Sequence, residues 1–338
     1  MTNIDTVVEE LLQPSDALVA DIAQLKGDIL LLGVGGKIGP SLALLARRAI
    51  DRAGISKKVI GVSRFSEPDM KEELEQNGIE TLAADLMNET DLQALPNVEN
   101  VLYLAGTKFG TTGRESFTWA MNAYLPGRVV EKYKDSKIVV YSTGNVYPYT
   151  NVASGGATEE VKPAPVGEYG QSCLGRERVF EHFSNQYKTP LLIYRLNYAN
   201  DLRYGVLMEI AKSVKEKKPI DISTGHVNVI WQGDANEIAL RSFLHCSVPA
   251  KLLNVTGPET ASLRWIAGEF GRIFKEEPLF TGQEESTALL SNAAESFHLF
   301  GYPKVSLKEM INLTAEWLLQ NGKTIYKPTH FQERKGQY

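Results

Sequence analysis

The chain has 338 residues, of which 43% are hydrophobic and 23% charged, and its formal net charge is −5. This composition fits a globular protein with a substantial core, and the negative charge argues against a nucleic-acid-binding face. No apolar run approaches the roughly 18 residues of a membrane helix, and the acidic N-terminus lacks the basic flank of a signal peptide. Two cysteines, Cys173 and Cys246, favour a reducing cytoplasm over a disulfide framework, and the five scattered histidines predict no metal site.

Residues 1–27 are expected to form an N-terminal extension, because apolar residues recur at helical spacing from Ile4 to Leu12. The short apolar run DILLLG (28–33) is typical of a buried parallel strand, and residues 39–54 predict a helix with Pro40 in its first turn. Further strand-like runs alternate with helical patterns: VIGVS (59–63), IETLAA (79–84), NVLYLAG (100–106), KIVVYST (137–143) and PLLIYRL (190–196). This alternation predicts an α/β fold, a doubly wound parallel sheet with helices on both faces.

The alternation loosens after about residue 200. One more strand-like run, residues 252–257, is expected to return to the main sheet, and helical patterns follow near 262–274 and 306–321. We therefore predict a larger α/β domain over residues 28–200 and a smaller lobe over residues 201–338 that closes over a substrate. The polar tail YKPTHFQERKGQY is expected to be a surface arm.

The segment LLLGVGGKIG places Gly33, Gly36 and Gly39 three residues apart, between a predicted strand and a predicted helix. Glycines let the backbone turn sharply and approach a ligand, and the following helix presents free N–H groups to phosphates. This context predicts the diphosphate site of NAD or NADP and makes residues 28–200 a Rossmann domain. The alternative is a glycine-rich turn without a ligand.

The end of the second predicted strand bears on the choice of cofactor. An Asp or Glu there would bond the ribose hydroxyls of NAD, but this chain has Ser63 and Arg64. Arg64 is a candidate clamp for the additional phosphate of NADP, with Ser63 donating a hydrogen bond. We therefore favour NADP over NAD. The alternative is that Arg64 and Lys37 are solvated surface charges.

The order of these motifs resembles the extended short-chain dehydrogenase/reductase family, the NAD(P)-dependent sugar epimerases and dehydratases, over roughly residues 28–260. The resemblance rests on LLGVGGKIG, AADL, VLYLAGTK, YSTGNVYP, EYGQSC, IYRLNYA and NVIWQGDANEIA, whereas Leu32 and Glu168 depart from the family pattern. It implies a sugar or sugar-nucleotide substrate, a cytoplasmic location and a homodimer paired through the helices that carry Asn122 and Tyr169. The implied cofactor contacts are Gly33, Gly36, Lys37, Ile38, Gly39, Ser63, Arg64, Asp85, Leu86, Ala105, Gly106, Lys108, Asn122, Tyr169, Cys173 and Asn197.

In that family a tyrosine four residues before a lysine transfers a proton while a hydride moves to or from the nicotinamide. The resemblance assigns this role to Tyr169 and assigns the partner hydroxyl to Thr143, but Cys173 stands in the place of the lysine. Cysteine cannot supply the cation that moves a tyrosine pKa from about 10 toward the operating pH. Arg176 lies one helical turn beyond Cys173. It would supply the missing cation if its side chain reached back toward the nicotinamide ribose. The alternative is that Arg176 is a surface or interface charge.

Three hypotheses for the site remain open. Tyr169 and Thr143 catalyse with a substitute for the lysine, and the charge of the nicotinamide provides part of the pKa shift. Alternatively, the protein binds the cofactor without catalysis, as a sensor or partner subunit, or a protonated Tyr169 donates its proton during reduction of a ketone. We favour an NAD(P)-dependent oxidoreductase, epimerase or dehydratase that acts on a sugar or sugar-nucleotide. Its candidate substrate contacts are Arg114, Asn197, His226, Asn228 and Trp231.

Overall fold

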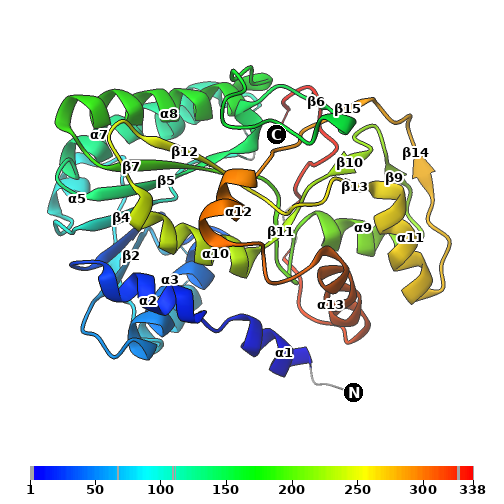
Figure 1. Cartoon of the computed structure of the whole chain (residues 1–338), viewed down its shortest axis with the longest axis horizontal. Helices are drawn as coiled ribbons and strands as arrows, with labels where there is room; N and C mark the ends of the chain where they lie inside the picture. The colour runs from blue at the N-terminus through cyan, green and yellow to red at the C-terminus, as the bar shows by residue number, and fades with distance from the viewer. Residues whose placement is uncertain (1–3, 67, 109, 111, 326–327, 338) are drawn as a thin grey trace.

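The computed structural model describes residues 4–66, 68–108, 110, 112–325 and 328–337. Within these residues a seven-stranded parallel sheet has the strand order β12-β7-β5-β4-β1-β2-β3 (Figure 1). Its strands are β1 (Ile29–Leu32), β2 (Val59–Ser63), β3 (Glu80–Ala83), β4 (Asn100–Tyr103), β5 (Lys137–Thr143), β7 (Leu191–Leu196) and β12 (Lys251–Val255). The predicted α/β fold with a doubly wound parallel sheet is confirmed.

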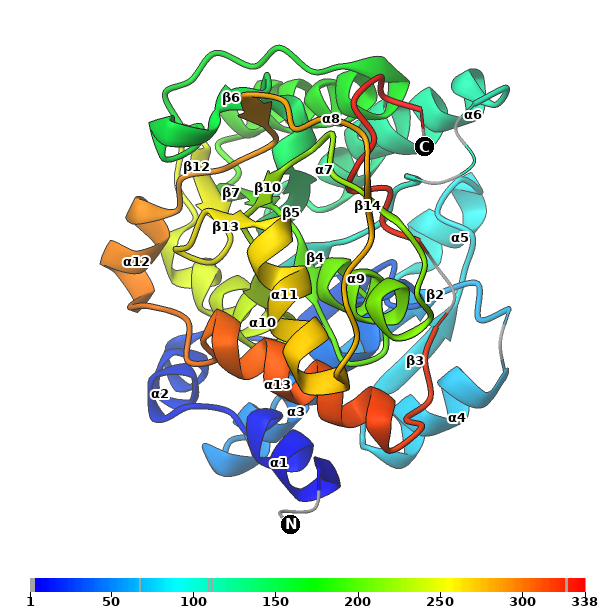
Figure 2. The same cartoon turned by 90° about the vertical axis from the view of Figure 1, so that its right-hand side faces the viewer.

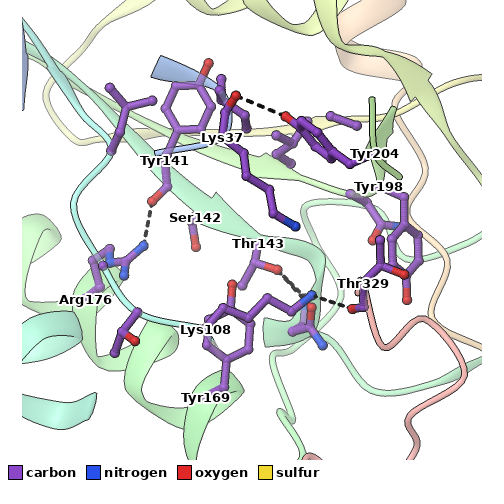
Figure 3. Close-up of a pocket in the computed structure, with 18 residues that line it drawn as sticks. Lys37, Lys108, Tyr141, Ser142, Thr143, Tyr169, Arg176, Tyr198, Tyr204 and Thr329 are labelled. Carbon is purple, nitrogen blue, oxygen red and sulfur yellow. Dashed lines mark hydrogen bonds between the residues drawn. The ribbon is translucent and has the colours of Figure 1, made fainter. Parts of the chain in front are cut away.

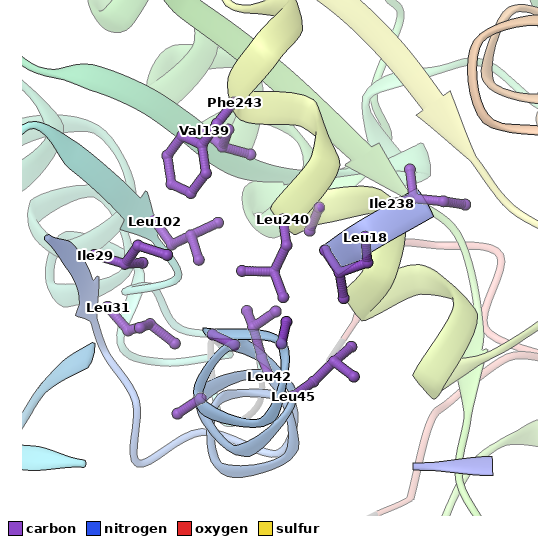
Figure 4. Packing of buried hydrophobic residues seen from close by; sticks show 14 of the residues in the cluster. Leu18, Ile29, Leu31, Leu42, Leu45, Leu102, Val139, Ile238, Leu240 and Phe243 are labelled. Atoms are coloured by element: carbon purple, nitrogen blue, oxygen red, sulfur yellow. The ribbon is translucent and has the colours of Figure 1, made fainter. Parts of the chain in front are cut away.

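Apolar side chains cover both faces of the sheet because successive residues of a strand point to opposite sides. In β1, Ile29 and Leu31 join one buried cluster, and Leu30 and Leu32 join another. The first cluster, shown in Figure 4, packs against α2 (Asp16–Gln24), α3 (Gly39–Arg52), α4 (Pro68–Gln76) and α10 (Gln232–Arg241). The second packs against α5 (Glu89–Ala94), α7 (Leu125–Lys132) and α8 (Gly167–Tyr187).

The strand order reverses beside β1, which pairs with β2 on one side and β4 on the other. The loops that follow β1 and β4 therefore diverge and leave a crevice at the carboxyl edge of the sheet, where ligands bind in open α/β folds. The glycine segment follows β1, and residues 104–108 follow β4. Thr143 ends β5, which places the predicted catalytic hydroxyl at the same edge.

A smaller lobe packs beside this edge around its own apolar core. Its helices are α9 (Val206–Lys215), α11 (Leu263–Phe274) and α13 (Leu307–Leu319), and α12 (Ala294–Phe300) lies between it and β12 (Figure 1). Paired short strands complete it: β8 (Ala199–Asn200) with β11 (Ile230–Trp231), β9 (Ile220–Asp221) with β14 (Phe280–Thr281), β10 (His226–Val227) with β13 (Ala261–Ser262), and β6 (Thr150–Asn151) with β15 (Thr287–Ala288). The N-terminal extension joins both parts, because α1 (Ile4–Leu11) contacts α13 and α2 contacts α3.

The C-terminal tail, predicted as a surface arm, packs against the body of the molecule along its described length. Figure 2 shows it rising from α13 toward α8, across the front of the molecule. Phe331 is buried in the core of the lobe, and Gly336 lies against Gly167, the first residue of α8. The described part, residues 328–337, therefore spans both parts of the molecule, whereas Tyr326, Lys327 and Tyr338 lie outside the described residues.

Candidate active site

A cavity of about 290 Å³ lies at the carboxyl edge of the sheet, between the Rossmann domain and the lobe (Figure 3). It contains Tyr169 and Thr143 together, as the resemblance implied. Its described lining residues are Lys37, Ile38, Leu104, Gly106, Thr107, Lys108, Tyr141, Ser142, Thr143, Asn145, Tyr169, Arg176, Leu196, Asn197, Tyr198, Ala199, Tyr204 and Thr329. The described side chains include no group of three or more His, Cys, Asp or Glu residues arranged to hold a metal ion.

The glycine segment has the geometry that a diphosphate requires. Gly33 has a φ of +96°, and a side chain at Gly39 would meet the carbonyl oxygen of Val34 at 2.1 Å, so both positions need glycine. Gly36 is exposed, and a Cβ there would meet only the Gly33 oxygen, at 3.6 Å, which leaves this stretch of backbone open to a ligand. No side chain caps the start of α3 at Ile38. The first N–H groups of a long helix are therefore available to an anion, and the segment fits a dinucleotide.

The end of β2 lies beside this segment. A Cβ at Gly35 would meet the hydroxyl oxygen of Ser63 at 2.4 Å, so Ser63 borders the glycine turn closely. Arg64 is exposed directly after β2. Asp85 is also exposed, where its carboxylate accepts a hydrogen bond from the Met87 amide (3.0 Å). Leu86, which follows β3, and Ala105, which follows β4, are both buried.

Tyr169 and Thr143 point into the centre of the cavity from α8 and β5 (Figure 3). Thr143 accepts a hydrogen bond from the Asn145 amide (3.1 Å), which fixes the hydroxyl at the end of the strand. Burial raises the pKa of Tyr169 well above its ordinary value, while Arg176 and a hydrogen bond with Thr143 act in the opposite direction. The phenol is therefore protonated at neutral pH.

Arg176 does reach back into the site from a position about two helical turns after Tyr169 in α8. Its guanidinium is buried and donates hydrogen bonds to the Tyr141 carbonyl (2.8 Å) and to Asn122 Oδ1 (2.8 Å). A Cβ at Gly106 would lie 2.3 Å from one of its nitrogens, so glycine at this position makes room for the guanidinium. A cation thus stands beside Tyr169 although the lysine of the family pattern is missing.

Asn122 supports this arrangement from behind the cavity. It lies in a π-helical turn, η1 (Ala120–Tyr124), between α6 (Glu115–Trp119) and α7, just before Pro126. Its side chain bonds both the N–H and the carbonyl of Thr107 (2.9 Å each) and also contacts Ser172 (3.0 Å). Asn122 therefore holds the loop after β4 against α8, and it does not line the cavity itself.

Cys173 occupies the position of the missing lysine but is fully buried against Tyr147 and Val146. Burial raises the pKa of its thiol, so the group is neutral and not a thiolate. It does not line the cavity. The thiol packs against Tyr169 and shares a hydrogen bond with it.

Two lysines enter the cavity on its other side (Figure 3). The ammonium of Lys108 lies 5.6 Å from the centre of the Tyr169 ring and donates to the Thr329 carbonyl (3.4 Å). Burial and the nearby charge of Lys37 lower the pKa of Lys108 to about 8. Lys37 Nζ lies 4.9 Å from the centre of the Tyr204 ring, and the Tyr204 hydroxyl donates to the Lys37 carbonyl (3.1 Å).

A buried ion pair lies directly behind the catalytic edge. Glu177 of α8 accepts hydrogen bonds from two nitrogens of Arg195 in β7 (3.0 and 2.6 Å) and from the Ser142 hydroxyl (2.5 Å). Arg195 also donates to the Tyr147 hydroxyl (2.6 Å). This network fixes the helix that carries Tyr169 against the strand that ends in Thr143.

The predicted substrate contacts do not all lie at the cavity. Asn197 lines the cavity and donates to Asn228 (2.8 Å), which is buried behind it. His226 and Trp231 lie in the short strands of the lobe, and Arg114 stacks on Phe117 before α6; these three residues do not line the cavity.

The sequence analysis did not identify several lining residues. Asn145, Tyr198, Tyr204 and Thr329 are among them. Asn145 and Tyr198 stood within the quoted motifs YSTGNVYP and IYRLNYA, but no rule of spacing distinguished them from their neighbours. Thr329 enters the cavity only because the tail folds back, and no pattern in the sequence indicates this.

A Rossmann sheet, an open glycine segment and a tyrosine–threonine pair at the crevice define a nicotinamide-dependent enzyme class. A family model described as the NAD dependent epimerase/dehydratase family matches residues 29–246, and the chain belongs to this family. The family confirms the resemblance found in the sequence. No curated protein sequence matched the chain.

Solved structures of similar fold cover nearly the whole chain. UDP-glucuronic acid 4-epimerase from Bacillus cereus, in complex with a fluorinated UDP-sugar and NAD, has a TM-score of 0.71 at 21% identity, with 87% of this chain and 99% of that chain covered. UDP-glucose 4-epimerase from Thermotoga maritima, with UDP-glucose, has a TM-score of 0.70 at 18% identity, with the same coverage of each chain. An epimerase from Methanothermobacter thermautotrophicus has a TM-score of 0.69 at 16% identity, with 90% and 96% covered. At sequence identities this low, the structural similarity supports the fold alone.

Proposed function

We propose that the protein is an NAD(P)-dependent oxidoreductase, epimerase or dehydratase that acts on a sugar or sugar-nucleotide, with Tyr169 as the proton-transfer residue and Thr143 as its hydroxyl partner. The observation that carries the proposal is the convergence of Tyr169, Thr143 and the buried Arg176 on one cavity beside the glycine segment. A nicotinamide bound there would supply the hydride donor or acceptor. Arg176 supplies a positive charge next to the phenol, the electrostatic part of the lysine's role.

Tyr169 is best suited to the reduction of a ketone, the direction of reaction in which the phenol gives up its proton. Because burial raises its pKa, the phenol is protonated at neutral pH and can donate to the oxygen of a ketone as hydride arrives at the carbon. Thr143 holds the same oxygen by a hydrogen bond. In the opposite direction the phenolate must form, and the positive charge of Arg176 lowers the cost of forming it.

The side chains present favour NADP over NAD. Arg64 is exposed at the end of β2, and the adjacent strand-end residue Ser63 carries a hydroxyl and no carboxylate. Arg64 would pair with the additional phosphate, and Ser63 would donate a hydrogen bond to it.

Replacement of Tyr169 by phenylalanine tests the proposed chemistry. We expect Tyr169→Phe to lower turnover by about 10²–10⁴-fold, the usual contribution of a positioned acid or base, with cofactor affinity nearly unchanged. Tyr187→Phe is the matched control, because Tyr187 ends the same helix away from the cavity. Full turnover in the Tyr169 variant would refute the assigned role. Cofactor binding by the wild type without turnover of any sugar would favour the alternative, a sensor or partner subunit.

We also propose a homodimer through the face formed by α6, η1 and the start of α8. Large apolar side chains are exposed there: Phe117, Trp119, Tyr124 and Val166. An exposed patch of this kind is typical of a contact surface. None of the described helices combines the length and the apolar character that crossing a bilayer requires. The scarcity of cysteine supports a cytoplasmic location.

A further inference from the structure

We propose that the substrate is a small sugar acid, a free monosaccharide that carries a carboxylate, and not a nucleotide-linked sugar. The inference rests on the proposed function and concerns the same cavity. Two observations carry it: the charge of the residues that line the cavity, and the way the C-terminal tail closes it.

The lining of the cavity is positively charged. Lys37, Lys108 and Arg176 line it, and no Asp or Glu is among its described lining residues. Glu209 stands just outside, where it interacts with the two lysines and accepts a hydrogen bond from the Thr329 amide (2.5 Å). Among the described residues, Glu209 is thus the carboxylate that faces the two lysines, whereas Arg176 interacts with Glu177, which is itself paired with Arg195. The raised pKa values of Tyr169 and Cys173 keep both of these groups neutral.

The positions of the lysines suit a substrate more than the cofactor diphosphate. Backbone N–H groups at the start of α3 are available to the diphosphate. The side chain of Lys37 extends away from that helix, toward Tyr204 and the centre of the cavity, and Lys108 approaches the ring of Tyr169 (Figure 3). A carboxylate between the two ammonium groups would lie beside the catalytic hydroxyls of Tyr169 and Thr143.

The tail sets the size of the cavity. The Thr329 carbonyl accepts from Lys108 of the Rossmann domain (3.4 Å), and the Phe331 carbonyl accepts from Tyr198 of the lobe (3.4 Å). Further on, the Glu333 carbonyl accepts from Tyr149 (2.8 Å), and Arg334 donates to the Thr287 carbonyl (2.7 Å). The tail is thus held at successive points across the opening, and its own residue Thr329 is part of the wall.

The remaining space suits a monosaccharide. The volume of about 290 Å³ is at the lower end of the roughly 300–1,000 Å³ of small-molecule pockets. The nicotinamide and its ribose must share this volume with the substrate. This volume leaves no room for the diphosphate and second nucleoside of a nucleotide-linked sugar.

Calorimetric titration tests the inference on the Tyr169→Phe protein, in which binding is separated from turnover. The protein is titrated with and without saturating NADP⁺, using glucuronate and galacturonate, the neutral glucose and galactose, glucose 6-phosphate, UDP-glucose and UDP-glucuronate. We expect a sugar acid to bind at least about tenfold more tightly than its neutral counterpart and more tightly than the phosphate or either UDP-sugar. Loss of one charge-assisted hydrogen bond in Lys37→Met or Lys108→Met should weaken acid binding by about tenfold or more. Lys134→Met, an exposed site at the end of α7, should leave it unchanged.

The other outcomes contradict the inference in distinct ways. Equal affinity for acid and neutral sugars would show that the lysines do not select the substrate, and tighter binding of glucose 6-phosphate would replace the carboxylate by a phosphate. Tighter binding of a UDP-sugar would show that the tail does not limit substrate size. Absence of NADP⁺ and NAD⁺ binding would refute the proposed function, while the titrations without cofactor would still decide whether the cavity selects small acids.

Discussion

Replacement of Glu177 by glutamine is the sharpest test of how the catalytic edge is held together. The side chains of Glu177 and Arg195 are 0% and 1% exposed, and the carboxylate accepts three hydrogen bonds. Glutamine keeps the shape but removes the negative charge and one acceptor, and so leaves the Arg195 guanidinium buried without a counter-charge. Breaking a buried pair in this way costs about 3–5 kcal/mol of unfolding free energy.

A matched control lies on the same helix. Arg178 and Glu181 form a pair whose side chains are 55% and 25% exposed. Glu181→Gln should cost no more than about 1 kcal/mol, because water solvates the charges of an exposed pair. Urea denaturation followed by circular dichroism gives both free energies by linear extrapolation.

A double variant separates the effect of the two charges from the effect of the volume that the side chains fill. Glu177→Leu with Arg195→Met removes both charges and retains apolar volume, so we expect it to be more stable than Glu177→Gln alone. The Ser142 hydroxyl loses its acceptor in this variant, which costs about 1–3 kcal/mol and limits the recovery. The reasoning is refuted if Glu177→Gln is as mild as Glu181→Gln, or if the double variant is the least stable of the three.

Two further predictions concern charge and assembly. Because burial lowers the pKa of Lys108 to about 8, the folded protein releases this proton at a lower pH than the unfolded chain does. The free energy of unfolding should therefore rise with pH above about 8. Affinity for an acidic sugar should fall over the same range, because Lys108 loses its charge. Calorimetry on either side of pH 8 measures this decline, and a similar decline in Lys108→Met would assign it to another group. Tyr124, 61% exposed on the proposed dimer face, should be sensitive to charge: Tyr124→Glu is expected to give monomers by light scattering, and an unchanged mass would place the interface elsewhere.

The sheet could be predicted because each of its strands is marked by a pattern of residues that are adjacent in the sequence. A strand that is buried on both faces needs an unbroken apolar run, as in β1, and the glycine segment that follows has a spacing that few other structures require. The same local signal placed Tyr169 and Thr143 at the carboxyl edge. Residues 115–132 are helical from α6 through α7, but they contain the π turn of η1 before Pro126, which the sequence pattern does not indicate.

The remaining features depend on contacts between distant segments. Arg176 reaches the site because Gly106, seventy residues earlier, has no side chain. A spacing rule along α8 shows only that Arg176 shares a helix face with Tyr169. The tail is polar and carries one buried anchor, Phe331, while most of its other contacts are made by backbone carbonyls. Backbone hydrogen bonds leave no mark on composition, so the sequence predicted a surface arm but not its contribution to the wall of the cavity.

Titration of the nucleotide-free protein with NADP⁺ and NAD⁺ tests the central claim most directly, because every proposed role at the cavity depends on a nicotinamide bound beside Tyr169. We predict one site per chain with micromolar affinity, tighter for NADP⁺, and we expect Arg64→Ala to remove that preference while affinity for NAD⁺ is retained. A well-folded protein that binds neither cofactor would contradict the account.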